Sequence, residues 1–262
     1  KRLGHAKVLD SVVQDGLWDV YEDCHMGMTA ELVAEKYGIS RQAQDLYALE
    51  SHRRAVNTTK KLGFKNEIVA LSVPCRKSKP IIFKHDEGPR EDTSLEKLGK
   101  LRPAFKVNGT VTAGNAPSTN DGAAALVVTS SKQAKIWGKK PLARIVGHAT
   151  SGTEPRWVMM APVTAVKKLL KKIDWRLEEL DLIELNEAFA VQAIAVIKEL
   201  GLNPAKTNVN GGAVALGHPI GASGARILVT LLHALKQRNL CRGIAVLCLG
   251  GGNAVALAIE RE

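Results

Sequence analysis

The stretch Asn210-Gly-Gly-Ala-Val-Ala-Leu-Gly-His-Pro-Ile-Gly-Ala-Ser-Gly224 places a single histidine, His218, in a glycine-rich turn. Glycine is used where a Cβ cannot be tolerated, and ordering it costs conformational entropy. We expect Gly217, Pro219, Gly221 and Gly224 to bring the backbone close to the imidazole on both sides. Packing alone does not require four such residues around one side chain, so His218 is a candidate functional residue.

A second glycine-rich turn, Cys248-Leu-Gly-Gly-Gly252, follows an apolar run near the end of the sequence. A cysteine in such a run is commonly a small hydrophobic core residue. The three consecutive glycines have no evident packing purpose, however, and they leave bare backbone N–H groups beside the thiol. Such an arrangement suits a site that must stabilise a negatively charged oxygen.

These two turns follow Asn186-Glu-Ala-Phe-Ala190, and the three motifs in this order resemble the thiolase family of acyl-CoA acyltransferases. The resemblance continues through Leu101-Arg-Pro-Ala-Phe105, Gly109-Thr-Val-Thr-Ala-Gly-Asn-Ala116 and Asn120-Asp-Gly-Ala-Ala-Ala125. It extends over essentially all 262 residues. Family members are built from two similar halves, and their covalent nucleophile is a cysteine in the first half.

The sequence opens on Lys1, at a point that resembles the stretch just after that nucleophile. None of its four cysteines lies in the Cys-Gly-Ser-Gly type of context that the nucleophile occupies. We therefore expect the C-terminal two-thirds of a thiolase, inactive as this chain alone. A second polypeptide would supply the N-terminal half with the nucleophile, and the whole would form a higher oligomer.

The resemblance implies an α/β thiolase fold with layers in the order αβαβα. Residues 1–106 would form a loop domain that covers coenzyme A, 107–140 the end of the N-terminal half, and 141–262 the complete C-terminal half with the pattern βαβαβαββ. Apolar spacing and end signals predict helices over residues 29–38, 40–61, 162–172, 187–200 and 223–237. Strands are predicted over 142–149, 182–185, 207–209, 244–249 and 254–260, and 74–90 is expected to form extended strands or loops. We expect residues 123–128 to be an unpaired apolar strand.

The composition fits a soluble globular protein, with 45% hydrophobic and 24% charged residues. Four irregularly spaced cysteines favour neither a disulfide scaffold nor a zinc site, and no apolar run is long enough for a membrane span. The net charge of +11 suggests a polyanionic partner. Aromatic residues make up only 4%, so base-stacking surfaces are scarce and coenzyme A is a better candidate than nucleic acid. The lysines at 167, 168, 171 and 172 are expected to form a solvated helix face. The expected location is cytoplasmic, with the mitochondrial matrix as the alternative.

The resemblance assigns four catalytic roles. Cys248 would be the acid/base that removes and returns the α-proton of an acyl-CoA, which requires neighbouring donors to bring its pKa towards the working pH. His218 would activate the nucleophilic cysteine and help to bind a thioester oxygen. Asn186 would hold a water at the same oxyanion site, although it could instead be the N-cap of the following helix. The backbone N–H of Gly250 would contribute to a second oxyanion hole.

The resemblance also implies contacts with coenzyme A. The predicted substrate-binding residues are Leu17, His25, Met26, Arg90, Ala113, Ser118 and Phe189. Arg90 could equally be a solvated loop arginine, and Pro117 stands where some members have a serine. Cys24 beside His25 matches no nucleophile motif.

The predicted activity interconverts two acetyl-CoA with acetoacetyl-CoA and CoA, with the coenzyme A thioester as substrate and no metal or other cofactor. His25-Met26-Gly27 resembles the pantetheine-contacting turn of thiolases that act on acetoacetyl-CoA, and this resemblance favours short acyl chains. The alternatives are a 3-ketoacyl-CoA thiolase of broader chain length and a non-catalytic acyl-CoA-binding module.

Overall fold

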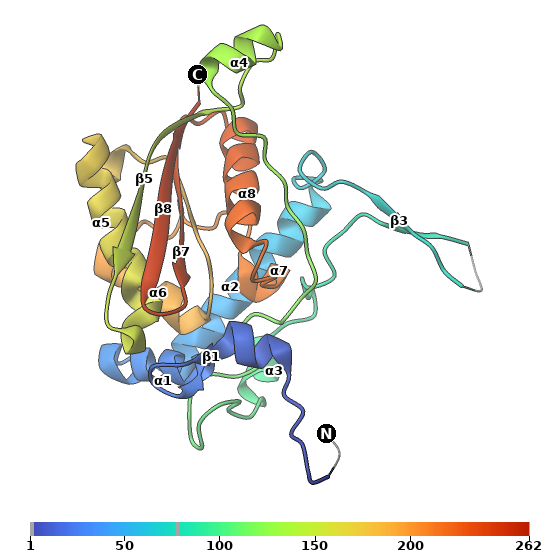
Figure 1. The fold of residues 1–262 in the computed structure, drawn as a ribbon, viewed down its shortest axis with the longest axis vertical. Coiled ribbons are helices and arrows are strands. Elements are labelled where there is room, and N and C mark those ends of the chain that lie inside the picture. Colours follow the sequence, from blue (N-terminus) through green and yellow to red (C-terminus); the bar gives the residue numbers. More distant parts are fainter. Residues whose placement is uncertain (1–2, 77–78, 262) are drawn as a thin grey trace.

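The computed structural model describes residues 3–76 and 79–261, so the parts of the predicted ranges that fall on 1–2, 77–78 and 262 lie outside the described residues. A four-stranded mixed sheet forms the centre of the molecule (Figure 1). Its strands are β5 (Arg144–Gly152), β6 (Leu182–Leu185), β7 (Arg242–Leu249) and β8 (Asn253–Glu260), in the order β5-β8-β7-β6. Only β6 and β7 are parallel to one another. Both are buried at several consecutive positions, as expected of strands that are covered on both faces.

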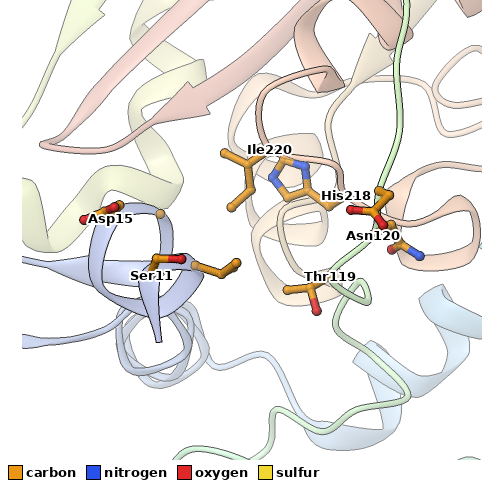
Figure 2. Close-up of a pocket in the computed structure, with 9 residues that line it drawn as sticks. Ser11, Asp15, Thr119, Asn120, His218 and Ile220 are labelled. Atoms are coloured by element: carbon orange, nitrogen blue, oxygen red, sulfur yellow. The ribbon is translucent and has the colours of Figure 1, made fainter. Parts of the chain in front are cut away.

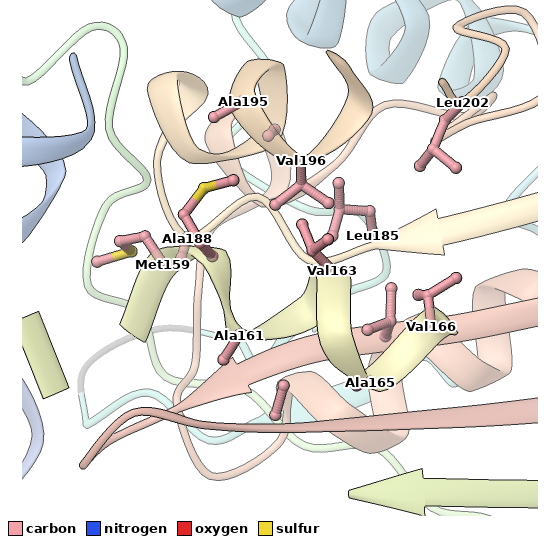
Figure 3. Packing of buried hydrophobic residues seen from close by; sticks show 14 of the residues in the cluster. Met159, Ala161, Val163, Ala165, Val166, Leu185, Ala188, Ala195, Val196 and Leu202 are labelled. Atoms are coloured by element: carbon pink, nitrogen blue, oxygen red, sulfur yellow. The ribbon is translucent and has the colours of Figure 1, made fainter. Parts of the chain in front are cut away.

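Helices cover the two faces of this sheet. Helix α5 (Ala161–Ile173) packs against β5 and β8, and α8 (Ser223–Gln237) packs on β6 and β7. Helix α6 (Ala190–Leu200) lies beside α5 and extends the same buried core (Figure 3). The predicted strands at 142–149, 182–185, 244–249 and 254–260 and the helices at 162–172 and 223–237 are therefore confirmed.

The predicted lysine face of α5 is exposed, and two of its lysines also donate hydrogen bonds to the sheet. Lys168 Nζ donates to the carbonyl oxygen of Thr150 at 3.0 Å, and Lys172 Nζ donates to that of His148 at 3.1 Å. Both acceptors belong to β5, the outermost strand of the sheet. An exposed strand edge invites pairing with other chains, and lysines that occupy its carbonyls oppose this pairing.

The first hundred residues contain two long helices that pack against α6, and a hairpin that projects into solvent. They form η1 (Val13–Leu17), β1 (Trp18–Asp19), β2 (Cys24–His25), α1 (Met26–Tyr37), α2 (Arg41–Lys60), β3 (Leu71–Val73), β4 (Ile81–Phe83) and α3 (Leu95–Gly99). The hairpin β3–β4 projects from the body (Figure 1). Gly38 ends α1 with a φ of 61°, and the Ser40 hydroxyl caps α2 by accepting from the Ala43 N–H at 3.2 Å, as the sequence predicts. The remaining elements are α4 (Ser131–Ile136), η2 (Pro155–Met160), η3 (Leu177–Glu179) and α7 (Ala213–Leu216).

Three local predictions were wrong. Helix α6 begins at Ala190 rather than at 187, because Phe189 is extended, with a φ of −154° and a ψ of 155°. Its N-cap is therefore Phe189, which excludes the N-cap role for Asn186. Helix α1 begins three residues before Thr29, since the His25 ring accepts the Gly27 N–H. The strand predicted at 207–209 is reduced to one bridge between Ile183 and Thr207.

The segment at 123–128 forms no regular strand, and it pairs with nothing in the described part of the chain. Val127 is 85% exposed and Val128 is 70% exposed. Such surface is unusual for two adjacent β-branched residues, which pack well in sheets. Within residues 3–76 and 79–261, no helix is long and apolar enough to cross a membrane.

Candidate active site

The site lies where the parallel strands β6 and β7 end, because the carboxyl ends of parallel strands meet at one edge of a sheet. Asn186 follows β6 directly, and its backbone N–H donates to the Val246 carbonyl on β7 at 2.9 Å. Cys248 lies two residues beyond Val246, opposite Ala254 of β8. The ladder therefore brings Asn186 and Cys248 to the same edge of the sheet.

His218 lies in the loop before α8 and is held at three points. Its backbone N–H donates to the Ser118 carbonyl at 3.2 Å. Its Nδ1 lies 2.5 Å from the Ser223 Oγ, and its Nε2 lies 3.4 Å from the Asn186 Nδ2. Burial and, to a smaller extent, the positive charge of Arg226 lower the pKa of His218 to about 4. The imidazole is therefore neutral at physiological pH.

Of the three glycines expected to flank the imidazole, Gly217, Gly221 and Gly224, only Gly217 is required by its surroundings. Gly217 has a φ of +94°, and a Cβ there would lie 2.2 Å from the Asn120 Oδ1. Gly221 has open space around it, and Gly224 would make only an ordinary contact with Leu247. The expectation of close backbone approach at all these positions was wrong.

His218 faces a cleft of about 530 Å³ between the N-terminal segment and the centre of the chain (Figure 2). Ser11, Val12, Asp15 and Gly16 line one side of this cleft. The other side is formed by His218 and Ile220 together with Thr119, Asn120 and Asp121. Asn186 and Cys248 are not among the lining residues, so Asn186 is connected to the cleft through His218.

The thiol of Cys248 packs against the main core, although part of the residue remains exposed. Burial raises its pKa to about 11, and the opposing effect of a backbone hydrogen bond is smaller. This differs from the expectation that neighbouring donors bring the pKa towards the working pH. Cys248 is therefore a neutral thiol in the protein as described.

The glycines after Cys248 differ in their roles. Gly251 and Gly252 have φ values of 77° and 84°, and a Cβ on Gly252 would lie 2.2 Å from the Thr153 carbonyl oxygen. These two glycines thus have a structural purpose in the β7–β8 turn, contrary to expectation. Gly250 has no such requirement, and the space where its Cβ would lie is open. Its position is compatible with the predicted approach of a ligand.

Two of the predicted substrate contacts, His25 and Phe189, are connected by an aromatic residue that the sequence reasoning missed. The Phe105 ring stacks on His25 with centroids 4.7 Å apart, and its edge meets Phe189 at 6.0 Å. Met26 and Phe105 pack against the same core. A Cβ on Gly27 would overlap the Phe105 ring, which explains the glycine there. Burial lowers the pKa of His25.

The other predicted contacts are distributed unevenly. Leu17 ends η1, which touches the His218 loop where Gly16 meets Ile220. Ser118 donates its hydroxyl hydrogen to the Asn120 Oδ1 at 2.8 Å, beside the same loop. Ala113 is exposed in a turn. The backbone N–H of Arg90 donates to the His52 Nδ1 on α2, and Arg90 is not among the cleft residues.

The carboxylate of Glu187 is a structural centre that the sequence reasoning missed. Glu187 is 1% exposed and accepts hydrogen bonds from the Tyr47 and Ser51 hydroxyls, the Asn208 amide and the Val214 N–H, at 2.8–3.1 Å. These donors come from α2, from the segment between α6 and α7, and from α7. A glutamate inside an apolar run was the available signal, because a buried carboxylate requires partners.

Behind His218, Arg226 of α8 interacts electrostatically with three carboxyl groups. Its Nη1 lies 3.7 Å from the Oε2 of Glu184, which is 2% exposed. Burial raises the pKa of Glu184 to about 8 and that of Glu67 to about 7, and it also raises the pKa of Asp86. Arg226 opposes all three shifts. In the described parts of the chain, no group of three or more histidine, cysteine, aspartate or glutamate residues could hold a metal ion.

Comparison with known proteins identifies the class. A family model described as "Thiolase, N-terminal domain" matches residues 1–132, and one described as "Thiolase, C-terminal domain" matches residues 139–261. The chain belongs to the thiolase family, and it has the predicted thiolase fold.

Similar proteins include acetyl-CoA acetyltransferases of Pseudomonas aeruginosa, 52% identical over 261 residues, and of Chromobacterium violaceum, 54% identical over 260 residues. These matches cover 100% and 99% of this chain. The structure of the Bacillus anthracis acetyl-CoA acetyltransferase matches with a TM-score of 0.97 at 48% identity. That of human mitochondrial 3-ketoacyl-CoA thiolase matches with a TM-score of 0.92 at 39% identity. Both cover 100% of this chain, and the chain spans 66% of the length of all four proteins.

The cluster around Arg226 predicts how stability depends on pH. The folded-state pKa values of Glu184 and Glu67 lie above their ordinary value of 4.5, so folding favours their protonated forms. The contribution of the protonated carboxyl groups to the free energy of unfolding is fully present below pH 4.5. It is lost as the pH rises through about 7 for Glu67 and about 8 for Glu184. We expect the Glu184→Gln variant to lose less stability than wild type between pH 5 and 9, by on the order of 2–4 kcal/mol.

Denaturant unfolding at a series of pH values measures this difference. Glu178→Gln is the matched control, because Glu178 is exposed and should leave the pH dependence unchanged. If the free energies of unfolding of wild type and Glu184→Gln change with pH in the same way, the prediction is contradicted, whatever the difference between the two proteins at any one pH.

Proposed function

We propose that these residues form the larger part of the active site of an acetyl-CoA C-acetyltransferase, which interconverts two acetyl-CoA with acetoacetyl-CoA and CoA. The observation that carries the proposal is the convergence of Asn186 and Cys248 at one edge of the sheet, with His218 connecting Asn186 to the cleft. The names of the relatives from Pseudomonas aeruginosa and Chromobacterium violaceum support the same activity. A coenzyme A thioester is the substrate, with no further cofactor.

In this proposal the acyl group is first carried by a cysteine outside residues 1–262, in the same or a second polypeptide. The Nε2 of His218 takes the proton of that thiol, and the thiolate attacks the thioester carbonyl of acetyl-CoA, which releases CoA. Within the described residues, no thiol lies in hydrogen-bond contact with His218. The exposed apolar segment at 123–128 offers a surface to which the remainder of the enzyme would pack.

Cys248 then acts on the second acetyl-CoA. The CoA thiolate released in the first step takes the proton of Cys248, and the Cys248 thiolate so formed removes a proton from the α-carbon. The resulting carbanion attacks the acyl-enzyme carbonyl and expels the carrier thiolate, which recovers its proton from His218. In the reverse direction, cleavage of the carbon–carbon bond leaves a carbanion that Cys248 protonates. A pKa near 11 keeps the thiol protonated and ready for this second role. The Gly250 N–H would stabilise the enolate oxygen, and Asn186 would hold a water at the other thioester oxygen.

The second candidate is a non-catalytic acyl-CoA-binding module. It is favoured only by the absence of a nucleophile next to His218 in the described residues. Binding alone would not require Cys248, His218 and Asn186 together, so the enzymatic proposal is the stronger one. The higher oligomer and the cytoplasmic or mitochondrial location are also proposals.

The role of Cys248 can be tested in the complete protein. We expect Cys248→Ala to lower kcat for thiolysis of acetoacetyl-CoA by about 10²–10⁴-fold, because that is the usual contribution of a general acid or base. Acetylation of the carrier cysteine by acetyl-CoA does not need Cys248, so intact mass should still show one added acetyl group.

Cys241→Ala is the control, because Cys241 is an exposed free cysteine. Activity of Cys248→Ala close to that of wild type would exclude its assigned role. No covalent acetylation in either variant or in wild type would favour the binding module.

Chain length gives a separate prediction. His25, Phe105 and Phe189 form a packed aromatic group beside Met26, which leaves little freedom for a long acyl chain. We expect kcat/KM for acetoacetyl-CoA to exceed that for a long-chain 3-ketoacyl-CoA. A higher value for the long substrate would instead support a thiolase of broader chain length, such as the structurally similar human mitochondrial 3-ketoacyl-CoA thiolase.

A further inference from the structure

The Ser223 hydroxyl lies on the side of His218 that faces away from Asn186. Ser223 is 1% exposed, and its Oγ is 2.5 Å from the His218 Nδ1 and 3.0 Å from the Pro219 carbonyl oxygen. It is the first residue of α8, so a helix fixes its position. The hydroxyl therefore connects the imidazole to a backbone carbonyl across a buried gap.

A count of hydrogens decides how these groups are joined. A hydroxyl has one hydrogen to donate, whereas a carbonyl oxygen can only accept. If the Ser223 hydrogen is donated to Pro219, the hydroxyl oxygen must accept from His218, and Nδ1 carries the ring hydrogen. The reverse arrangement would direct the Ser223 lone pairs at the Pro219 oxygen over 3.0 Å, which is electrostatically unfavourable.

The other side of the ring is consistent with this assignment. The Asn186 Nδ2, a donor, lies 3.4 Å from the His218 Nε2, where a lone pair is then present. Nε2 is therefore the nitrogen that can accept a proton. Because the two nitrogens of a neutral imidazole have opposite roles, the bond made by one determines the chemistry of the other.

The charge of the group that contacts Nδ1 affects the pKa of His218, so a serine and a carboxylate would act differently at this position. The charged group that shifts the pKa of His218 is Arg226, three residues after Ser223, and the Arg226 Nη1 lies 3.7 Å from the Glu184 Oε2. A carboxylate at Nδ1 would stabilise the protonated imidazolium. A hydroxyl orients the ring without adding charge, so His218 remains neutral until it takes a proton.

We propose that Ser223 is the positioning residue for His218, and that it holds the imidazole as the Nδ1–H tautomer with the Nε2 lone pair available to the cleft. This proposal deepens the acyl-transfer function above and rests on it for its catalytic consequence. When Nε2 accepts the thiol proton, the Nδ1–H bond to Ser223 is retained. The same orientation then lets the new Nε2–H donate to a thioester oxygen and later return the proton.

The complete protein with ¹⁵N-labelled histidine tests the proposal directly. The chain has seven histidines, and the His218→Gln variant identifies the signals of His218. NMR should show a protonated Nδ1 and an unprotonated Nε2 in wild type and in Ser223→Thr, which keeps the hydroxyl. In Ser223→Ala we expect a mixture of tautomers and a loss of kcat of about 10–100-fold, the usual effect of removing an orienting partner. KM should change little.

Ser151→Ala is the matched control, because the Ser151 hydroxyl also donates to a backbone carbonyl, that of Ala161 at 2.9 Å, and does not contact His218. It should leave the tautomer and kcat unchanged. An unprotonated Nδ1 in wild type, or the same tautomer and kcat in Ser223→Ala as in wild type, would overturn the proposal. If wild type lacks thiolase activity, the proposed function fails, and the tautomer measurement still decides the role of Ser223. If Ser223→Ala does not fold, the wild-type and Ser223→Thr spectra decide it.

Discussion

The arrangement of the site depends on one buried carboxylate, that of Glu187. A charged group removed from water is tolerated only when its oxygens are hydrogen-bonded, and removal of one partner is strongly destabilising. Here the donors are Tyr47 and Ser51 of α2, Asn208 and the Val214 N–H. Glu187 directly follows Asn186, and Val214 is four residues before His218. The carboxylate therefore holds the segment that carries Asn186 and the segment that carries His218 in place against α2. Gly212 is needed for the same reason, since a Cβ there would lie 2.2 Å from the carboxylate carbon.

Burial has a second consequence, because it controls protonation at the site. It lowers the pKa of His218 to about 4 and raises that of Cys248 to about 11. Both groups are therefore neutral before a substrate binds. The imidazole has a free lone pair and the thiol keeps its proton, which are the forms that a base and an acid need. Arg226 lies behind this site, and its positive charge lowers the pKa values of Glu184 and Glu67 as well as that of His218.

Much of the fold could be predicted from local signals. Ser40 identified the start of α2, the apolar spacing of 223–237 identified α8, and two apolar runs around Gly250 identified the β7–β8 hairpin. His218 and Asn186 were predicted from their motifs, and they lie together. The roles of Glu187 and Ser223 were not predicted, because they depend on distant or geometric partners: Tyr47 is 140 residues from Glu187 in the sequence. The start of α6 was misplaced for the same reason. Tertiary contacts of Glu187 and the extended backbone of Phe189 override the local helical preference.

The most direct test of the central role of Glu187 is hydrogen exchange of the Val214 and Gly217 amides in Glu187→Gln, together with the free energy of unfolding. An amide side chain has a donor where the carboxylate has only acceptors, so it cannot satisfy all the present partners. We expect a loss of stability of about 2–4 kcal/mol and faster exchange at both amides, with Glu199→Gln, an exposed change on α6, as control. A loss below about 0.5 kcal/mol, with exchange at both amides as in wild type, would contradict this account.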